Sequence, residues 1–259
     1  MKIMLSALEN AQLSKAEGGG SIAQAIVKSG IDMKYNLMSY FYIRPRVELA
    51  EFIRDHTEEV MIDSGAHSFQ KGVKVDWVKY TEEYADFIRR FDRPNVVGYF
   101  EMDVDNIIGY DKVKALRNIL LRASDKIIPV WHKNRGIQDF KEMCQSHKGK
   151  IVAITGFKNE DIKDHQYLSF TKYAHECGCK IHCLGMTRKA ILDTVPFDYT
   201  DSSSWSAQSR FGHMQSYGGR KVSKDFSKNH RGVVFVENYK HGMQMQEHYH
   251  KLWQKECKD

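Results

Sequence analysis

The 259-residue sequence contains only four prolines and no long apolar run. The scarcity of proline argues against long disordered linkers. No segment approaches the ~20 consecutive apolar residues of a transmembrane helix, and residues 1–8 lack the pattern of a signal peptide. Cysteine is also scarce. The five cysteines are an odd number and are scattered along the chain, which favours reduced thiols over a disulfide framework. We therefore expect a cytoplasmic protein without a membrane partner.

Nucleotide-cofactor motifs are missing too. The sequence has neither a Walker-type loop nor a dinucleotide fingerprint. The run Gly18-Gly19-Gly20 lacks the strand-to-helix context of such a motif, so we interpret it as a flexible turn. No cofactor is therefore expected.

The remaining composition is that of an ordinary globular protein, with 42% hydrophobic and 28% charged residues. A chain of this length fits a single α/β barrel, since such barrels occupy roughly 250 residues. Short β-branched runs predict eight strands. These are Lys2–Leu8, Asn36–Ile43, Val60–Asp63, Val96–Met102, Ile127–Trp131, Ile151–Thr155, Lys180–Gly185 and a short strand ending near Asp201.

Amphipathic segments alternate with these strands. The clearest is Trp77–Phe91, whose apolar residues recur at the i, i+3, i+4, i+7 spacing of a helix with one buried face. The others are Ser21–Ser29, Val47–His56, Lys112–Ser124, Ile137–Gln145, Glu160–Glu176 and Arg188–Asp193. Repeated strand–helix alternation predicts parallel strands, and eight of them close a barrel; an open doubly wound sheet is the alternative. We expect one domain over residues 1–259, with a barrel core over 1–205 and an extension over 206–259 that contains an added strand, Gly232–Val236, and a closing helix, Tyr239–Lys255.

Two acidic segments are the strongest indication of chemistry. Asp63 ends the apolar run Val60-Met61-Ile62 and begins a Ser-Gly-Ala loop, and Asp201 is followed by three serines. Loops at the carboxyl ends of barrel strands form the active-site mouth, so these two acids could converge on one substrate. Such a pair suits acid and nucleophile chemistry at a glycosidic carbon. Each aspartate could instead simply cap a turn or a helix.

The segment Asp63-Ser64-Gly65 followed by Phe69-Gln70 resembles the Asp-Ser-Gly-Gly-Phe-Gln signature of tRNA-guanine transglycosylases. Here Ala66 replaces the second glycine and His67-Ser68 is inserted. The segment Asp198-Tyr199-Thr200-Asp201 resembles the Asp-x-x-Asp segment of that family, whose last acid is the nucleophile. The resemblance implies that Asp201 attacks the sugar and that Asp63 transfers protons.

The same resemblance implies a base pocket on the intervening strands. Asp103, at the end of the segment 98–103, or Asp105 just after it would hydrogen-bond the base, and His132 would replace an amide donor. Phe69 and Met186 could sandwich the heterocycle, although either could belong to the core. The base-binding residues that we expect are Ser64, Gly65, Phe69, Gln70, Asp103, Asp105, His132, Gly156, Gly185 and Met186.

Differences from the tRNA enzymes narrow the prediction. The zinc-binding Cys-x-Cys-x-x-Cys that follows the nucleophile in that family is absent, because Cys257 is the only cysteine after Asp201. The shorter chain and the Asp-Ser-Ser-Ser-Trp loop look more like the phage-type DNA-guanine transglycosylases. The resemblance therefore implies a pentosyltransferase that exchanges guanine in DNA for a 7-deazaguanine; an enzyme acting on tRNA is the alternative.

The net charge of +6 is compatible with a nucleic-acid partner. Positive residues gather after residue 219, where they could contact phosphates or simply form a solvated loop. Trp205 could stack on an extruded nucleotide, or belong to the core. The nucleic-acid-binding residues that we expect are Trp205, Arg210, Arg220, Lys221, Lys224, Lys228 and Arg231.

Two other functions remain open. One is a non-catalytic nucleic-acid-binding barrel subunit, against which the presence of both Asp63 and Asp201 argues. The other is a metal-dependent barrel hydrolase using those acids with His67 and His132, although the first strand lacks the His-x-His of such enzymes. A group of cysteines and one histidine precedes Asp201. A metal site formed by this group is less expected than ordinary buried thiols, because alternate residues on a strand point to opposite faces. That group comprises Cys177, Cys179, His182 and Cys183.

Overall fold

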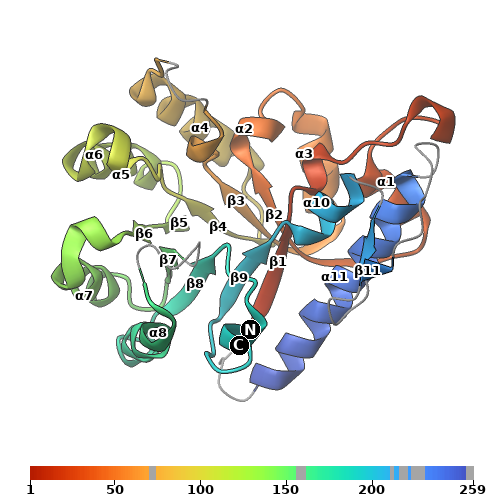
Figure 1. Ribbon diagram of the computed structural model, residues 1–259. Helices are drawn as coiled ribbons and strands as arrows, with labels where there is room; N and C mark the ends of the chain where they lie inside the picture. The colour runs from red at the N-terminus through yellow and green to blue at the C-terminus, as the bar shows by residue number, and fades with distance from the viewer. Residues whose placement is uncertain (70–73, 156–161, 211–212, 216–220, 223–230, 255–259) are drawn as a thin grey trace.

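A computed structural model describes residues 1–69, 74–155, 162–210, 213–215, 221–222 and 231–254. Its main sheet is parallel throughout and is surrounded by helices (Figure 1). The strands are β1 (Lys2–Ser6), β2 (Met33–Ser39), β3 (Thr57–Asp63), β4 (Val96–Phe100), β5 (Ile127–Ile128), β6 (Val130–Trp131), β7 (Ile151–Thr155), β8 (Lys180–Leu184) and β9 (Tyr199–Ser202).

Pro129 explains why the sheet has nine segments although eight strands were expected. The strand order is β5-β4-β3-β2-β1-β9-β8-β7-β6, so the two outermost segments are consecutive in the chain. Proline has no amide hydrogen to donate to a ladder, and it divides one strand into β5, which pairs with β4, and β6, which pairs with β7. The Pro129 carbonyl still accepts a hydrogen bond from Ala153 N at 2.9 Å. The sheet therefore closes through Pro129, and the prediction of an α/β barrel is confirmed.

Helices lie outside the strands in the order that the alternation predicted. The predicted helix Trp77–Phe91 has the same bounds in the structure, where Asp76 caps it by accepting a hydrogen bond from Lys79 N at 3.0 Å. The helices before the last are α1 (Ile22–Lys28), α2 (Tyr40–Ile43), α3 (Val47–Asp55), α4 (Trp77–Phe91), α5 (Asp105–Ile108), α6 (Tyr110–Leu121), α7 (Gly136–Ser146), α8 (Tyr167–Glu176), α9 (Lys189–Leu192) and α10 (Ser204–Arg210).

Side chains alternate between the barrel interior and the helix layer, as the pleat of a strand requires. The interior cluster is formed by Met4, Tyr35, Leu37, Met61, Phe100, Ile128, Val130, Ala153 and Tyr199. Two further buried clusters fill the space between the strands and the surrounding helices. On β3 and β9 the alternation that turns Met61 and Tyr199 inward also turns Asp63 and Asp201 inward, at the carboxyl ends of these strands.

The last helix, α11 (Arg231–Trp253), corrects the predicted strand Gly232–Val236. That segment is rich in β-branched residues, but Phe235, Tyr239, Gln246 and Tyr249 are buried at helical spacing. Gln246 Nε2 donates to the carbonyls of Ile3 and Tyr35 at 2.8 and 2.7 Å. These contacts with the barrel outweigh the local strand preference, and α11 packs on β1 (Figure 1).

Two smaller differences concern other elements. The predicted strand Asn36–Ile43 ends at Ser39, after which the chain forms α2. Residues Met214–Gln215 (β10) and Lys221–Val222 (β11) form a short antiparallel pair that sequence analysis did not predict. Within the described part of the chain, no helix is both long enough and apolar enough to cross a bilayer.

Candidate active site

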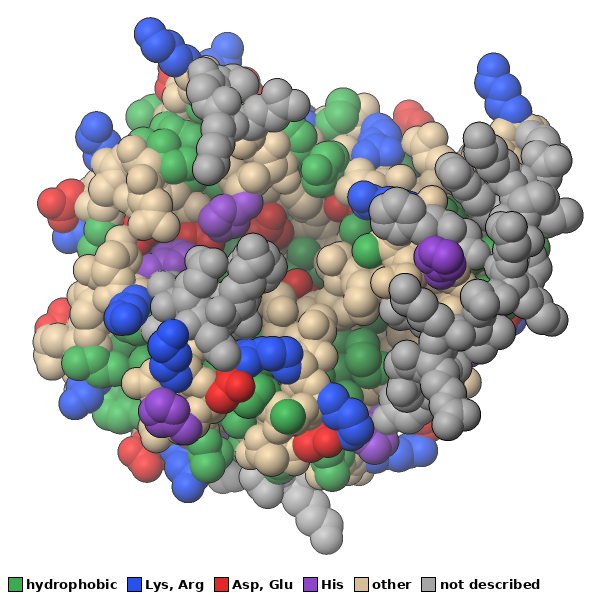
Figure 2. All heavy atoms as spheres, in the orientation of Figure 1, with side chains coloured by type: hydrophobic (Ala, Val, Ile, Leu, Met, Phe, Trp, Pro, Cys, Tyr) green, Lys and Arg blue, Asp and Glu red, His purple; other side chains and the backbone are tan. Residues whose placement is uncertain are grey.

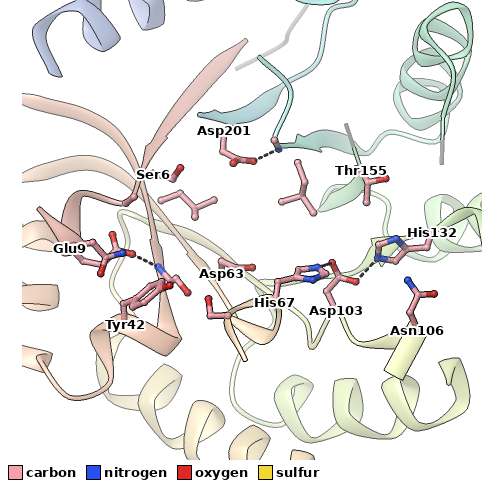
Figure 3. A pocket seen from close by; sticks show the side chains of 17 residues that line it. Ser6, Glu9, Tyr42, Asp63, His67, Asp103, Asn106, His132, Thr155 and Asp201 are labelled. Atoms are coloured by element: carbon pink, nitrogen blue, oxygen red, sulfur yellow. Dashed lines mark hydrogen bonds and ion pairs between the residues drawn. The ribbon is translucent and has the colours of Figure 1, made fainter. Parts of the chain in front are cut away.

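A cavity of about 590 Å³ opens at the carboxyl ends of the barrel strands. Acidic and histidine side chains gather in a hollow near the middle of this face, whereas Lys and Arg side chains lie mostly around its edge (Figure 2). The cavity is lined by Ser6, Ala7, Glu9, Asn10, Leu37, Ser39, Tyr42, Asp63, His67, Ser68, Asp103, Asn106, His132, Thr155, Leu184, Gly185 and Asp201 (Figure 3).

Asp63 is held at the end of β3 by a tight turn. Gly65 N donates to Asp63 Oδ2 at 2.9 Å. Gly65 has a φ of +73°, and a Cβ atom there would lie 2.4 Å from Phe41 Cβ and 2.7 Å from Ser39 Oγ. Only glycine fits this turn, so the Asp-Ser-Gly sequence fixes the position of the carboxylate.

The protein surroundings raise the pKa of Asp63 toward neutrality. Burial raises its pKa from 3.8 to about 6, and the charges of Asp103 and Asp201 add to this effect, whereas the hydrogen bond from Gly65 opposes it. A carboxyl group with a pKa near neutrality can both donate and accept a proton. Asp63 is therefore suited to proton transfer.

Asp201 is oriented from one side of its carboxylate. His182 Nε2 lies 3.0 Å from Asp201 Oδ1, and Gly185 N donates to the same oxygen at 2.8 Å. His182 is fully buried inside the barrel, with its ring 4.9 Å from that of Phe100. Both of these hydrogen bonds reach Oδ1, and among the described residues Asp201 Oδ2 has no hydrogen-bond partner while the side chain lines the cavity. Sequence analysis missed this role of His182.

Asp103 lies at the other end of the cavity, between two imidazoles (Figure 3). His67 Nε2 is 2.8 Å from Asp103 Oδ2, and His132 Nε2 hydrogen-bonds Oδ1. Burial alone would raise the pKa of Asp103, but the hydrogen bonds from His132 and His67 lower it below its ordinary value. The bond to Asp103 in turn raises the pKa of His67. Asp103 is therefore an ionised acceptor facing the cavity.

Asp105, the alternative base reader, is engaged elsewhere. Its side chain is 1% exposed and forms an ion pair with Arg135, which is equally buried; Arg135 Nη2 donates to Asp105 Oδ1 at 2.6 Å. Asp105 is not among the residues that line the cavity. The structure therefore turns only Asp103 toward the cavity, and Asp105 positions Arg135.

A buried ion-pair network supports this end of the cavity. Arg117 Nη2 donates to Glu101 Oε1 at 3.0 Å, and Glu101 Oε1 also accepts from Val130 N at 2.7 Å. Burial raises the pKa of Glu101, although both arginines oppose this effect. Arg135 lies 4.1 Å from the ring centre of Tyr110. The network fixes the strands that carry Asp103 and His132.

Three of these groups could also hold a metal ion. Asp103, Asp105 and His132 each offer one ligand atom, and these three atoms lie within 4.8 Å of one another. A cation there would have to compete with Arg135 for Asp105 and with two imidazoles for Asp103. The metal site of thiols and imidazole, which was the less expected alternative, does not form among the described residues, because His182 lies inside the barrel and Cys183 lies in the outer layer. Cys179 and Cys183 are buried thiols, as expected.

Glu9, which sequence analysis did not identify, is the third carboxyl group at the acidic side of the cavity. It lies in a 3₁₀ turn (Leu8–Asn10) after β1 and is 1% exposed. Burial raises its pKa from 4.5 to about 7, against hydrogen bonds from backbone groups and the charge of Arg46. Glu9 could have been found from the sequence, because Glu9-Asn10 comes soon after an apolar first strand and the loop after a barrel strand faces the mouth.

Several expected contact residues do not line the cavity. Phe69 packs edge to face against Phe41, Trp77 and Tyr80, with ring centres 5.0, 5.3 and 5.0 Å apart. Met186 is 1% exposed and belongs to the outer core. Of the two interpretations of Phe69 and Met186, the structure supports core packing, and neither side chain is placed to sandwich a base in the described cavity. Ser64 and Gly65 shape the Asp63 turn and are also absent from the described lining.

Trp205 is a second correction. It is 2% exposed, its Nε1 donates to the Ser6 carbonyl at 2.9 Å, and its ring packs against Phe235 and Tyr239. It therefore forms part of the core and cannot stack on a nucleotide. Arg210 is exposed at the end of α10.

Other predicted residues cannot be placed. Gln70, Gly156, Arg220, Lys224 and Lys228 lie outside the described residues. Lys221 begins β11 and Arg231 begins α11, where only the backbone is described. The phosphate-contacting surface stays a prediction.

Comparisons with models of known protein families and with curated protein sequences found no match.

Proposed function

We propose that the protein is a base-exchange transglycosylase that replaces guanine in a nucleic acid, with DNA the polymer favoured by the sequence resemblance, by a 7-deazaguanine. One observation carries this proposal. Asp63 and Asp201, 138 positions apart in the sequence, line a single cavity at the mouth of a barrel. One carboxylate can act as the nucleophile and the other can transfer the proton.

The exchange takes place in two displacements. Asp201 Oδ2 attacks C1′ of the target nucleotide while the bond from C1′ to guanine breaks, and guanine leaves with the bonding electrons and receives a proton. The incoming 7-deazaguanine then loses its N9 proton and attacks C1′, which breaks the bond between Asp201 and the sugar. Asp63, with its pKa of about 6, supplies the first proton and accepts the second.

Base recognition would fall to the end of the cavity that carries Asp103. Guanine and 7-deazaguanine both present N–H groups on their pairing edge, and an ionised carboxylate accepts hydrogen bonds from such groups. His67 and His132 hold Asp103 ionised and oriented. Asn106 and Thr155 add polar groups to the same part of the wall.

The position of the cavity at the barrel mouth also bears on the form of the polymer. A duplex hides both C1′ and the pairing edge of guanine, so the target nucleotide must be extruded or unpaired at a cost of a few kcal/mol. Contacts in the cavity would offset this cost.

The test is exchange of labelled guanine into DNA and into tRNA by the purified protein. We expect label in one polymer with the wild-type protein and none with Asp201→Ala, while nucleic-acid affinity is retained. Asp86→Asn is the matched control, because Asp86 is an exposed aspartate on α4 that pairs with Arg89. Label entering with Asp201→Ala, or no label in either polymer with the wild-type protein, contradicts the proposal.

A further inference from the structure

The acidic end of the cavity contains two polar atoms that lack a partner. Glu9 Oε1 accepts from Ser39 N at 3.2 Å, but Glu9 Oε2 and Ser39 Oγ are buried without a hydrogen bond in the described structure. Both side chains line the cavity (Figure 3). A buried carboxylate oxygen without a hydrogen-bond partner costs free energy. These two atoms therefore suggest a ligand group that would supply the missing hydrogen bonds.

The surroundings restrict the chemistry of that group. Among the described lining residues there is no lysine or arginine, whereas four carboxyl groups are present: Glu9, Asp63, Asp103 and Asp201. The charge of Arg46 acts on Glu9, but Arg46 Nη2 already donates to Asn10 Oδ1 at 3.2 Å and to the Tyr42 carbonyl at 3.1 Å. A phosphate at this end would meet carboxylates without a balancing cation, so the position suits a neutral hydroxyl group.

The strand order places this pair beside the reacting carbon. In the sheet, β1 lies between β9, which carries Asp201, and β2, which ends at Ser39. Met4 of β1 pairs with Asp201, and Ser39 pairs with Asp63 of β3. Glu9 and Ser39 therefore lie on the wall between the nucleophile and the proton-transfer group.

We infer that Glu9 and Ser39 form a subsite for the sugar hydroxyl adjacent to the anomeric carbon, which is the 2′-hydroxyl of a ribonucleotide. This inference rests on the proposed function, because that function places C1′ at Asp201. The hydroxyl donates to Glu9 Oε2 and accepts from Ser39 Oγ, so all three groups are satisfied. Hydrogen bonds to the 2-hydroxyl strengthen in transition states at glycosidic carbons.

The consequence is a preference for ribose at the target nucleotide. A deoxyribose presents only a CH₂ group at this position and leaves both buried atoms unpaired. Sites built to hydrogen-bond a hydroxyl reject the analogue that lacks it. The subsite therefore favours the tRNA alternative over DNA, or a target ribonucleotide in any strand.

The experiment compares two oligonucleotides that differ only in the target sugar, guanosine or 2′-deoxyguanosine. For the wild-type protein we expect kcat/KM to favour guanosine by on the order of 10² or more. Glu9→Ala and Ser39→Ala should each reduce this preference to a few fold. Asn106→Ala, at the other end of the cavity, is the matched control and should lower exchange on both sugars without changing their ratio.

A wild-type protein that exchanges equally on both sugars, or a Glu9→Ala protein that keeps the full preference, overturns the inference. If no polymer supports exchange, the proposed function fails while the subsite can still be tested by calorimetry with free guanosine and 2′-deoxyguanosine. Tighter binding of guanosine by roughly 10-fold, lost in Ser39→Ala, supports the subsite. Equal binding of the two nucleosides, or no binding, rejects it.

Discussion

The two halves of the cavity wall handle carboxyl groups in opposite ways. In the acid half, formed by β9, β1, β2 and β3, burial raises the pKa of Asp63 to about 6 and that of Glu9 to about 7. In the histidine half, formed mainly by β4, β6, β7 and β8, imidazoles hydrogen-bond Asp103 and lower its pKa. Carboxyl groups are thus able to take up a proton near neutral pH on one side and are held ionised on the other.

This difference indicates where the folded state loses stability through buried carboxyl groups. A carboxyl group whose pKa is raised by burial destabilises the folded state once it ionises. In the acid half, Glu9 and Asp63 both destabilise the folded state in this way. In the histidine half, the carboxylate of Asp103 is paired with His67 and His132. The acid half is therefore where a substrate would complete the unpaired groups, and the histidine half is the preorganised support.

Among the variants that separate the two halves, the largest effect is expected from Asp63→Asn, which removes the proposed proton-transfer group of the acid half. The side chain remains similar in size, but the amide cannot exchange a proton. Steady-state kinetics should show kcat lower by roughly 10²–10⁴, the usual contribution of general acid–base catalysis. An Asp63→Asn protein with more than half of the wild-type kcat would show that Asp63 does not transfer the proton.

Arg135→Ala tests the support of the histidine half. It leaves the buried carboxylates of Asp105 and Glu101 without this cation, and breaking such a buried pair costs about 3–5 kcal/mol. Urea unfolding should show this loss. The matched change, Arg89→Ala, removes an exposed pair with Asp86 and should cost less than about 1 kcal/mol; equal losses for the two variants would refute the role of Arg135.

Glu9→Gln should stabilise the protein at alkaline pH. The folded-state pKa of about 7 lies above the ordinary value of 4.5, so the folded state binds more protons between these pH values and wild-type stability falls as the pH rises through this window. Glutamine cannot ionise. We expect the variant to gain about 1–3 kcal/mol relative to wild type between pH 4 and pH 8, measured by urea unfolding; a difference independent of pH would show that Glu9 is not desolvated.

His67→Ala should have the smallest effect on stability. The His67 side chain is 73% exposed, so its ion pair with Asp103 should contribute about 0.5 kcal/mol or less. His132 is largely buried against the same carboxylate, and His132→Ala should cost about 1–3 kcal/mol. If both histidine variants unfold at the same urea concentration, the two imidazoles contribute equally and this ranking is wrong.

Much of the architecture could be predicted from the sequence because strand and helix periods are local signals. The predicted bounds of α4 agree with the structure, and every predicted barrel strand corresponds to an observed one. The segment 232–236 was assigned wrongly because long-range packing determines its conformation: Phe235 packs against Trp205 of α10. The division of one predicted strand into β5 and β6 at Pro129 could not be predicted, because it depends on β5 pairing with β4 and β6 pairing with β7.

The site was predicted unevenly for a similar reason. Asp63 and Asp201 lie two residues after the inward-facing Met61 and Tyr199, and His132 lies two residues after Val130, so the alternation of the strands turns these three into the cavity. Asp103 lies in the segment after β4, and its hydrogen bonds with His67 and His132 hold it there. Trp205 has the residue type of a stacking platform, but its burial depends on α11, which no local pattern reveals. His182 could be found only through its spatial neighbour Asp201, since 19 positions separate them.

The most direct test of the central claim is the mass of the protein after incubation with a guanine-containing substrate and no incoming base. We expect a covalent sugar adduct that maps by peptide sequencing to Asp201 and is absent from Asp201→Ala. An adduct on any other residue, or none while exchange proceeds, would contradict it.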